Sequence, residues 1–274
     1  MNFDADILIM GAGVYGANQI TAETHAALSR CARIFHLTVS EDVGRYLASN
    51  FSSAQSLVPL YVDGKLDLDV YHEIAQLVID CARVLRPTGL LVVGHPSFYV
   101  SPTELILERA FRQGLTVHVY PAVSTLDAMM AMLRIDIGRT GVQIMDCNRL
   151  VTYALRPDAR LPLLLYQIGT FGTGFITRTK RNSAGRFREL VDYLGTLYPP
   201  RHRVLIAECA MSAVHQGRWE WVPLQSLASH ALSINYNSTL LVPPSRPLEV
   251  SDQRFFRGLT DIGLAGGMIS TDDG

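Results

Sequence analysis

The chain has 274 residues, of which 48% are apolar and 18% are charged, with 24 basic and 25 acidic side chains. This composition excludes intrinsic disorder, and the length allows one large domain or two medium ones with a core that needs no disulfide or metal. The near balance of charge argues against nucleic-acid binding, because phosphate recognition draws on clustered basic residues and only Arg178, Lys180 and Arg181 cluster here.

The sequence predicts no targeting segment. The apolar run at 7–10 stops at Gly11 and no basic stretch precedes it, unlike a signal or transit peptide. No run approaches the roughly 20 apolar residues of a membrane helix. The four cysteines have no paired CxxC spacing, which predicts buried, reduced thiols and no metal site; they are Cys31, Cys81, Cys147 and Cys209. We therefore expect a soluble, cytoplasmic protein with neither a membrane nor a nucleic-acid partner.

The first half of the chain alternates strand and helix signals. Such alternation is typical of βαβ units around a largely parallel sheet. Apolar runs predict strands at 7–10, 33–38, 90–93 and 116–120. Helical periodicity predicts helices at 17–32, 70–85, 102–113 and 126–133.

The second half has a different pattern, with strands predicted at 161–167, 204–208, 215–222 and 233–242 and one clear helix at 185–197. This favours a second α/β lobe with a mixed or antiparallel sheet, joined to the first near residues 136–145. The tail carries Phe255, Phe256, Leu259 and Leu264 on a helical period, which predicts a short docking helix followed by a frayed end. The expected division is an N-terminal lobe (1–138), a C-terminal lobe (139–245) and a tail (246–274).

The run GAGVYG at 11–16 fits the fingerprint G-x-G-x-x-G between a strand and a helix, which raises a nicotinamide enzyme as one hypothesis. That fingerprint also needs an acidic residue at the end of the second strand to bind the ribose hydroxyls. The second predicted strand ends in FHLT, and the first carboxylate, Glu41, lies in the following loop. A tight turn that requires only small residues is the better hypothesis.

Two further loops follow predicted strands, GHP at 94–96 and YPAVST at 120–125. Open α/β sheets bind ligands at this carboxyl edge. His95 is either a hydrogen-bonded structural residue or a catalyst. Ser124 can cap the helix that follows and leave backbone N–H groups free for a ligand.

The series of a GAG-type loop, a GHP loop, a P-A-V-S-T loop and a β-rich second lobe resembles the tetrapyrrole methylases, which hold S-adenosylmethionine between two α/β lobes. In detail the chain is similar to the split borosin peptide α-N-methyltransferases. The shared runs are ITAET at 20–24, VSP at 100–102, LRID at 133–136, YQIG at 166–169 and STLLVPP at 238–244. The resemblance implies a two-lobe α/β fold with the cofactor in the cleft between a mostly parallel N-terminal sheet and a mixed C-terminal sheet.

The resemblance also implies the positions that hold S-adenosylmethionine. They come from the loops that follow predicted strands, namely Val93, His95, Phe98, Tyr99, Ser124, Thr125, Gln167, Ala210, Ser238 and Thr239. A sulfonium methyl donor suits a pocket with little water and few polar groups, because methyl transfer disperses its charge.

For catalysis the resemblance implies Tyr61 and Tyr71, with Asp67 where peptide methylases of this kind carry an arginine. Val93 replaces a third tyrosine, and Ser97 replaces a glycine. Because a carboxylate raises the pKa of a phenol, three alternatives stay open. Tyr71 acts beside Asp67, Asp69 or His72; the nucleophile is an amine or imidazole; or the protein binds cofactor without efficient turnover. Asp67 and Asp69 can also be solvated loop carboxylates.

The function that the resemblance implies is metal-free methylation of a backbone nitrogen in a separate, ribosomally made precursor peptide. We also expect this because the chain has no long C-terminal extension to carry a peptide in cis. The alternatives are methylation of a tetrapyrrole or another small molecule, permitted by the shared fold, and a cofactor-binding protein without turnover. A homodimer is expected from the resemblance and from the apolar tail.

Overall fold

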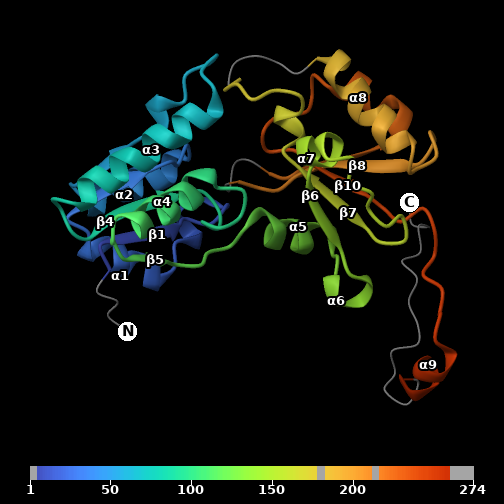
Figure 1. Ribbon diagram of the computed structural model, residues 1–274, viewed down its shortest axis with the longest axis horizontal. Coiled ribbons are helices and arrows are strands. Elements are labelled where there is room, and N and C mark those ends of the chain that lie inside the picture. Colours follow the sequence, from blue (N-terminus) through green and yellow to red (C-terminus); the bar gives the residue numbers. More distant parts are fainter. Residues whose placement is uncertain (1–4, 178–182, 212–215, 260–274) are drawn as a thin grey trace.

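The computed structural model describes residues 5–177, 183–211 and 216–259. Two lobes lie side by side, and each is built on a five-stranded sheet (Figure 1). The predicted two-lobe α/β architecture, with a parallel sheet followed by a mixed one, is confirmed.

The first lobe has a parallel sheet in the order β3-β2-β4-β1-β5. Its strands are β1 (Ile7–Gly11), β2 (Arg33–His36), β3 (Ala54–Ser56), β4 (Thr88–Val92) and β5 (Val117–Val119). Its helices are α1 (Ala22–Arg30), α2 (Glu41–Asn50), α3 (Asp67–Ala82) and α4 (Ser101–Arg112).

Strand β1 explains why this sheet needs an unbroken apolar run. Ile7 and Ile9 belong to the cluster that α3 and α4 cover, whereas Leu8 and Met10 belong to the cluster that α1 and α2 cover. Because successive side chains of a strand point to opposite faces, a strand buried on both faces has no position for a polar residue.

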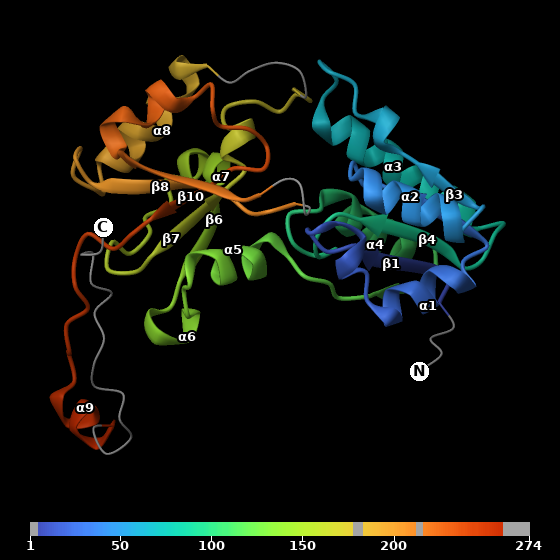
Figure 2. The same ribbon diagram turned by 180° about the vertical axis from the view of Figure 1, so that it is seen from behind.

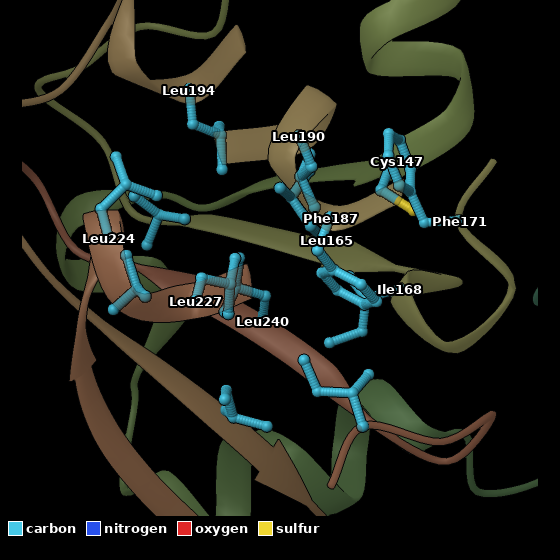
Figure 3. Close-up of a cluster of buried hydrophobic side chains, with 14 of the residues drawn as sticks. Cys147, Leu165, Ile168, Phe171, Phe187, Leu190, Leu194, Leu224, Leu227 and Leu240 are labelled. Carbon is cyan, nitrogen blue, oxygen red and sulfur yellow. The ribbon is translucent and has the colours of Figure 1, made fainter. Parts of the chain in front are cut away.

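The second lobe has a sheet in the order β6-β7-β10-β8-β9, in which β6 and β7 are parallel and the other pairs antiparallel. The strands are β6 (Gln143–Asp146), β7 (Leu163–Tyr166), β8 (Arg203–Glu208), β9 (Arg218–Pro223) and β10 (Thr239–Val242). Helices α7 (Cys147–Thr152) and α8 (Ala184–Gly195) and the 3-10 helix Leu224–His230 cover one face. Figure 3 shows the cluster beneath them, in which Phe187 and Leu190 of α8 meet Leu165 of β7.

The other face of the second sheet is covered in part by α5 (Thr125–Leu133), which precedes this sheet in the chain. Met129 of α5 packs in one cluster with Leu164, Leu205 and Leu241. The short helix α6 (Ile137–Thr140) follows. Helix α5 therefore links the lobes, and the division at residue 138 remains a prediction.

Several predicted elements differ in extent from the observed ones. The helix expected at 17–32 is a 3-10 turn (Gly16–Gln19) followed by α1, because the Thr21 side chain accepts from the Thr24 amide and starts a new helix. The strand expected at 233–242 is confined to β10, because the Ser238 amide donates to the Asn235 carbonyl and closes a turn. Residue 215, the start of another expected strand, lies outside the described residues.

The tail forms α9 (Gln253–Leu259), which stands apart from both lobes (Figures 1 and 2). Phe255 is exposed, so the helix forms as predicted but does not dock on its own core. Leu264 lies outside the described residues. Within the described part of the chain no helix has the length and apolar character to cross a membrane.

Candidate functional site

The loops after β1, β4 and β5 converge at the carboxyl edge of the parallel sheet. A Cβ on Gly11 would lie 2.2 Å from the carbonyl oxygen of Gly94 and 2.5 Å from the Cβ of Ala122. The amide of Gly94 also donates to the carbonyl of Gly13 at 2.9 Å. Only glycine fits at position 11, so the GAG, GHP and PAVST loops form one surface where such sheets bind ligands.

Side chains already occupy three amides of the first of these loops. Gln19 Oε1 accepts from the amides of Val14 at 2.7 Å and Tyr15 at 2.9 Å. Asp42 Oδ2 accepts from the amide of Ala17 at 2.9 Å, and helix α1 begins only at residue 22. Because a dinucleotide site uses free amides at a helix N-terminus, this geometry argues against the nicotinamide hypothesis.

Three aromatic rings meet between the lobes. Phe98 and Tyr99 follow β4, and Tyr166 ends β7. The Tyr99 ring stacks on Tyr166 with centroids 5.1 Å apart, and the Phe98 ring meets both edge-on, at 4.9 and 5.0 Å. The expected positions Phe98 and Tyr99 are thus brought together with a residue of the other lobe.

The backbone is strained at two of the expected cofactor positions. Tyr99 has φ of 57° and Gln167 has φ of 62°, in the left-handed region that residues other than glycine seldom adopt. Such conformations cost about 1–3 kcal/mol each and are concentrated at ligand sites. The two strained residues mark the loops after β4 and β7 as candidates for ligand contact.

The phenols of the aromatic group stay neutral at ordinary pH. Burial, helped by Asp146 and Cys147, raises the pKa of Tyr99 to about 12. Burial also raises the pKa of Tyr166, and the nearby Thr125 hydroxyl partly opposes that rise. Tyr166 Oη is buried without a partner in hydrogen-bonding geometry among the described residues. An unpaired buried hydroxyl is costly, so this atom is a candidate ligand contact.

The side chains of His95 and Ser124 each form hydrogen bonds within the loop that carries them. The Ser97 amide donates to His95 Nδ1 at 3.0 Å. Ser124 Oγ donates to Asp127 Oδ2 at 2.6 Å, and this hydrogen bond is the largest cause of the lowered pKa of Asp127. Both residues therefore have a structural role, whatever contact they make with a ligand.

Ser238 is held by a buried carboxylate. Glu208, which is 2% exposed, accepts from Ser238 Oγ at 2.6 Å and from Asn235 Nδ2 at 2.9 Å, and pairs with the Arg218 guanidinium at 2.7 Å. A Cβ on Gly169 would lie 2.2 Å from the Asn235 carbonyl oxygen. The turn before β10 is thus pressed against the loop after β7, which carries Gln167.

The remaining expected cofactor positions lie at strand ends. Val93 is half-buried directly after β4, Thr239 is buried at the start of β10, and Ala210 follows β8. The structure places them on the segments that border the aromatic rings and the Ser238 turn. Their contact with a cofactor stays a prediction.

The expected catalytic residues form a second group at the start of α3. The Tyr61 and Tyr71 rings lie 6.3 Å apart, and burial raises the pKa of both phenols. Asp67 raises the pKa of Tyr71 further, as expected for a carboxylate in place of an arginine. Neither phenol is therefore suited to act as a base at neutral pH.

The loop before α3 is bound to a segment of the second half of the chain. The amides of Gly64 and Asp67 donate to the carbonyls of Ile176 and Gly174, both at 2.9 Å. The amide of Ile176 donates back to the carbonyl of Lys65. Because these hydrogen bonds are between backbone groups, they fix the position of Asp67 whatever the side chains nearby.

His72 is not part of this group of tyrosines. Its imidazole Nδ1 pairs with the Arg109 guanidinium, which also donates to Gln76. Asp67 Oδ1 accepts from the Leu68 amide at 2.7 Å, while Oδ2 has no partner among the described residues. Of the three acceptors considered beside Tyr71, Asp67 is the one whose charge acts on that phenol.

A cavity of about 400 Å³ lies between the first loop, α5 and the end of β8. It is lined by Val14, Tyr15, Gln19, Ala128, Met132, Cys209, Ala210, Gln216, Gly217 and Trp219. Of the expected cofactor positions only Ala210 belongs to this set. Elsewhere in the described chain, no group of three or more His, Cys, Asp or Glu side chains is placed to hold a metal ion.

Sequence reasoning missed Gln19, Tyr166 and Glu208. Tyr166 stands in the shared run YQIG, and Glu208 is a carboxylate at the end of an apolar strand, which is a signal for a buried polar contact. For Gln19 the sequence holds no such signal, since its contact depends on how the turn at 13–19 folds.

Comparison with known proteins agrees with this geometry. Residues 6–218 match the model of the Tetrapyrrole (Corrin/Porphyrin) Methylases, and the chain belongs to this family. In fold it is similar to uroporphyrin-III-C-methyltransferase from Thermus thermophilus, with a TM-score of 0.60 at 16% identity over 88% of this chain and 93% of that one. Diphthine synthase is similar with a TM-score of 0.58 at 12% identity over 86% and 90%.

Curated relatives include two fungal proteins. The methyltransferase/ribosomally synthesized cyclic peptide dendrothelin A precursor of Dendrothele bispora is 24% identical over 75% of this chain and 49% of its own length. The corresponding omphalotin A precursor of Omphalotus olearius is 25% identical over 75% and 49%. The chain thus spans about half the length of the curated relatives it matches.

Proposed function

We propose that this protein is an S-adenosylmethionine-dependent methyltransferase that methylates a backbone nitrogen of a separate precursor peptide. The observation that carries the proposal is the pair of half-buried phenols beside Asp67, at the start of α3, in a chain of the tetrapyrrole methylase family. The names of the curated relatives combine a methyltransferase with a cyclic peptide precursor, which supports a peptide as the acceptor.

The residues present fit the methyl donor. The unpaired Tyr166 hydroxyl, the strained backbone at Tyr99 and Gln167 and the close approach at Gly169 mark the loops after β4 and β7 as the segments that would border the cofactor. The positions that would hold the cofactor are the ten expected from the sequence, with Tyr166 added. When bound, S-adenosylmethionine supplies a methyl group on a positively charged sulfur. The rings of Phe98, Tyr99 and Tyr166 can face such a cation favourably.

The acceptor side of the chemistry belongs to Tyr61, Tyr71 and Asp67. An amide nitrogen must lose its proton as it gains the methyl group, because the neutral N–H form is a very weak nucleophile. Raised pKa values keep both phenols protonated, so they donate hydrogen bonds to the amide oxygen and stabilise the negative charge that develops there. The open oxygen of Asp67 receives the proton from nitrogen.

The same carboxylate also favours a second acceptor class, an amine or imidazole nitrogen. Asp67 can orient and deprotonate such a group without an imidate-like oxygen. In that case the Tyr71 hydroxyl contributes little to the rate. The third alternative is cofactor binding without turnover. It rests on Asp67 and Val93, which stand where the resemblance implies an arginine and a tyrosine.

The experiment uses labelled S-adenosylmethionine with the peptide encoded beside this gene, added as a separate chain. We expect the peptide to gain the mass of one or more CH₂ units, and tandem mass spectrometry to place them on backbone nitrogens. Label on a side-chain nitrogen would support the second class. Label on a tetrapyrrole alone, or tight binding without transfer, would contradict the proposal.

We also propose that the protein works as a homodimer. Helix α9 stands apart from its own lobes with Phe255 exposed, a position suited to contact with a second copy (Figure 1). Sedimentation equilibrium at micromolar concentration tests this. A dimer mass is expected, and a monomer mass across the concentration range would contradict it.

A further inference from the structure

The cavity beside the first loop has a chemistry of its own. We propose that it seats one uncharged, apolar side chain of the acceptor peptide, and that the Gln19 amide donates a hydrogen bond to a carbonyl of that peptide. This inference rests on the function proposed above, because its occupant is a residue of the acceptor. The volume of about 400 Å³ lies within the usual range for small ligand sites.

The lining offers a charged occupant no partner of opposite charge. None of the lining residues is an Asp, Glu, Lys, Arg or His, and burial raises the pKa of the Cys209 thiol, which keeps it neutral. An ion that entered this space would lose hydration without meeting an opposite charge. An aliphatic or aromatic side chain fits, whereas the carboxylates of a tetrapyrrole do not.

The orientation of Gln19 is fixed by the first loop. Two backbone amides, of Val14 and Tyr15, donate to its Oε1 at 2.7 and 2.9 Å. Because Oε1 accepts these two hydrogen bonds, it faces the loop, and Nε2 points away from it. Nε2 meets no acceptor among the described residues. A half-buried N–H donor held in this way recognises a carbonyl oxygen, which every peptide unit provides.

The opposite wall leaves room for a side chain. Ala128, Cys209 and Ala210 are small. Gly217, the residue before β9, lies so close to α5 that a Cβ there would be 2.9 Å from Met132 Sδ. Beyond this contact Trp219, which is 58% exposed, forms the outer edge of the cavity. An indole at the mouth of a pocket suits contact with an apolar group.

If Ala210 holds the cofactor as the resemblance implies, the cavity lies next to it. Ala210 is the one lining residue that the family resemblance also assigns to S-adenosylmethionine. A peptide residue anchored here would therefore hold its neighbouring backbone beside the methyl donor. The cavity would select the peptide sequence, while the tyrosines and Asp67 act on the nitrogen.

Tryptophan fluorescence can report binding at the cavity, because the two tryptophans of the chain are Trp219 and Trp221. Trp221 lies two residues along β9, is 42% exposed and stacks with Arg203, but does not line the cavity. The variant Trp221→Phe leaves Trp219 as the only indole. The variant Trp219→Phe is the matched control, with an indole on the same strand outside the cavity.

The probes are the tripeptides acetyl-Gly-X-Gly-amide, with X as Leu, Phe, Asp or Lys, added with saturating S-adenosylhomocysteine. We expect the Leu and Phe peptides to shift Trp219 emission saturably, and the charged ones to bind at least about tenfold more weakly, as one unpaired buried charge requires. The Trp219→Phe control should show no shift. Gln19→Glu keeps an acceptor for the two loop amides, removes the donor and should weaken the Leu peptide about tenfold.

Equal binding of all four peptides, or no shift of Trp219 with any of them, would overturn the inference. A shift caused by S-adenosylhomocysteine alone, and weakened by Gln19→Glu, would assign the cavity to the cofactor and overturn it as well. The readout is binding, so it is separate from the proposed function. If the peptide is methylated but Trp219 emission does not change, only this inference is wrong. If the peptides bind but no methyl group is transferred, only the proposed function is wrong.

Discussion

The charge of Asp67 affects what the neighbouring Tyr71 phenol can do. A cation would lower the pKa of Tyr71, whereas Asp67 and burial both raise it. In the proposed mechanism the hydroxyl therefore donates a hydrogen bond instead of removing a proton. At this scale the chemistry of the site depends on a single side chain.

Tyr71→Phe removes only the hydroxyl. If that group stabilises developing charge on an amide oxygen, kcat for methyl transfer should fall about 10- to 100-fold, within the range for one such donor, with little change in cofactor affinity. Initial rates with labelled cofactor measure it. Tyr153→Phe, on an exposed tyrosine at the end of α7, is the control and should keep the parental rate. An unaltered rate in Tyr71→Phe would show that the phenol takes no part.

The raised pKa of Tyr71 also predicts how stability changes with pH. The folded state favours the protonated phenol, so this contribution is complete below the unfolded pKa of about 10 and is lost as the pH rises toward the folded value. Urea unfolding at pH 8 and pH 11 should show a smaller loss of unfolding free energy in Tyr71→Phe than in the parent. Equal losses would mean that this phenol is not buried.

At the scale of elements, close approach of loops matters more than helix propensity. Gly11→Ala introduces a Cβ 2.2 Å from the Gly94 carbonyl oxygen, so we expect a loss of at least about 2 kcal/mol in unfolding free energy. Gly44→Ala, inside α2 with open space around its Cβ, should gain about 0.5–1 kcal/mol. Urea denaturation measures both. The same sign for the two variants would refute the convergence of the three loops.

The turn before β10 depends on one buried carboxylate. Glu208→Ala leaves Ser238, Asn235 and the half-exposed Arg218 without their common partner, and should cost about 2–4 kcal/mol. Glu41→Ala breaks an exposed pair with Arg45 and should cost less than about 0.5 kcal/mol. Chemical denaturation of both variants measures these losses of unfolding free energy. A cost for Glu208→Ala as small as that for Glu41→Ala would mean that the network does not hold the turn.

Over the whole molecule, the parts that a local pattern determines were predictable. The apolar run of β1 predicted a strand buried on both faces, and Gly11 predicted the tight turn after it. Helix α2 was missed because Val43 and Leu47 are its only buried residues, too few for a clear period. Contacts between distant residues were also missed, such as Glu208 with Ser238, because no spacing in the sequence encodes them.

Among the site residues, sequence and structure contribute differently. The order of the loops in the chain identified the family, and the structure brings Phe98 and Tyr99 to Tyr166, and Tyr61 to Tyr71. The structure also shows that the Ser238 hydroxyl already donates its proton to Glu208, so it cannot donate to the cofactor at the same time. These roles remain predictions that ligand binding must test.

The central claim is that the space between the lobes fits a sulfonium methyl donor and not a nicotinamide dinucleotide. Isothermal titration calorimetry of the full chain with S-adenosylmethionine, S-adenosylhomocysteine and NAD⁺ tests it most directly. We expect saturable binding of the first two and none of the third, because Gln19 and Asp42 occupy the loop amides that a pyrophosphate needs. Binding of NAD⁺ without binding of either sulfur compound would contradict the account.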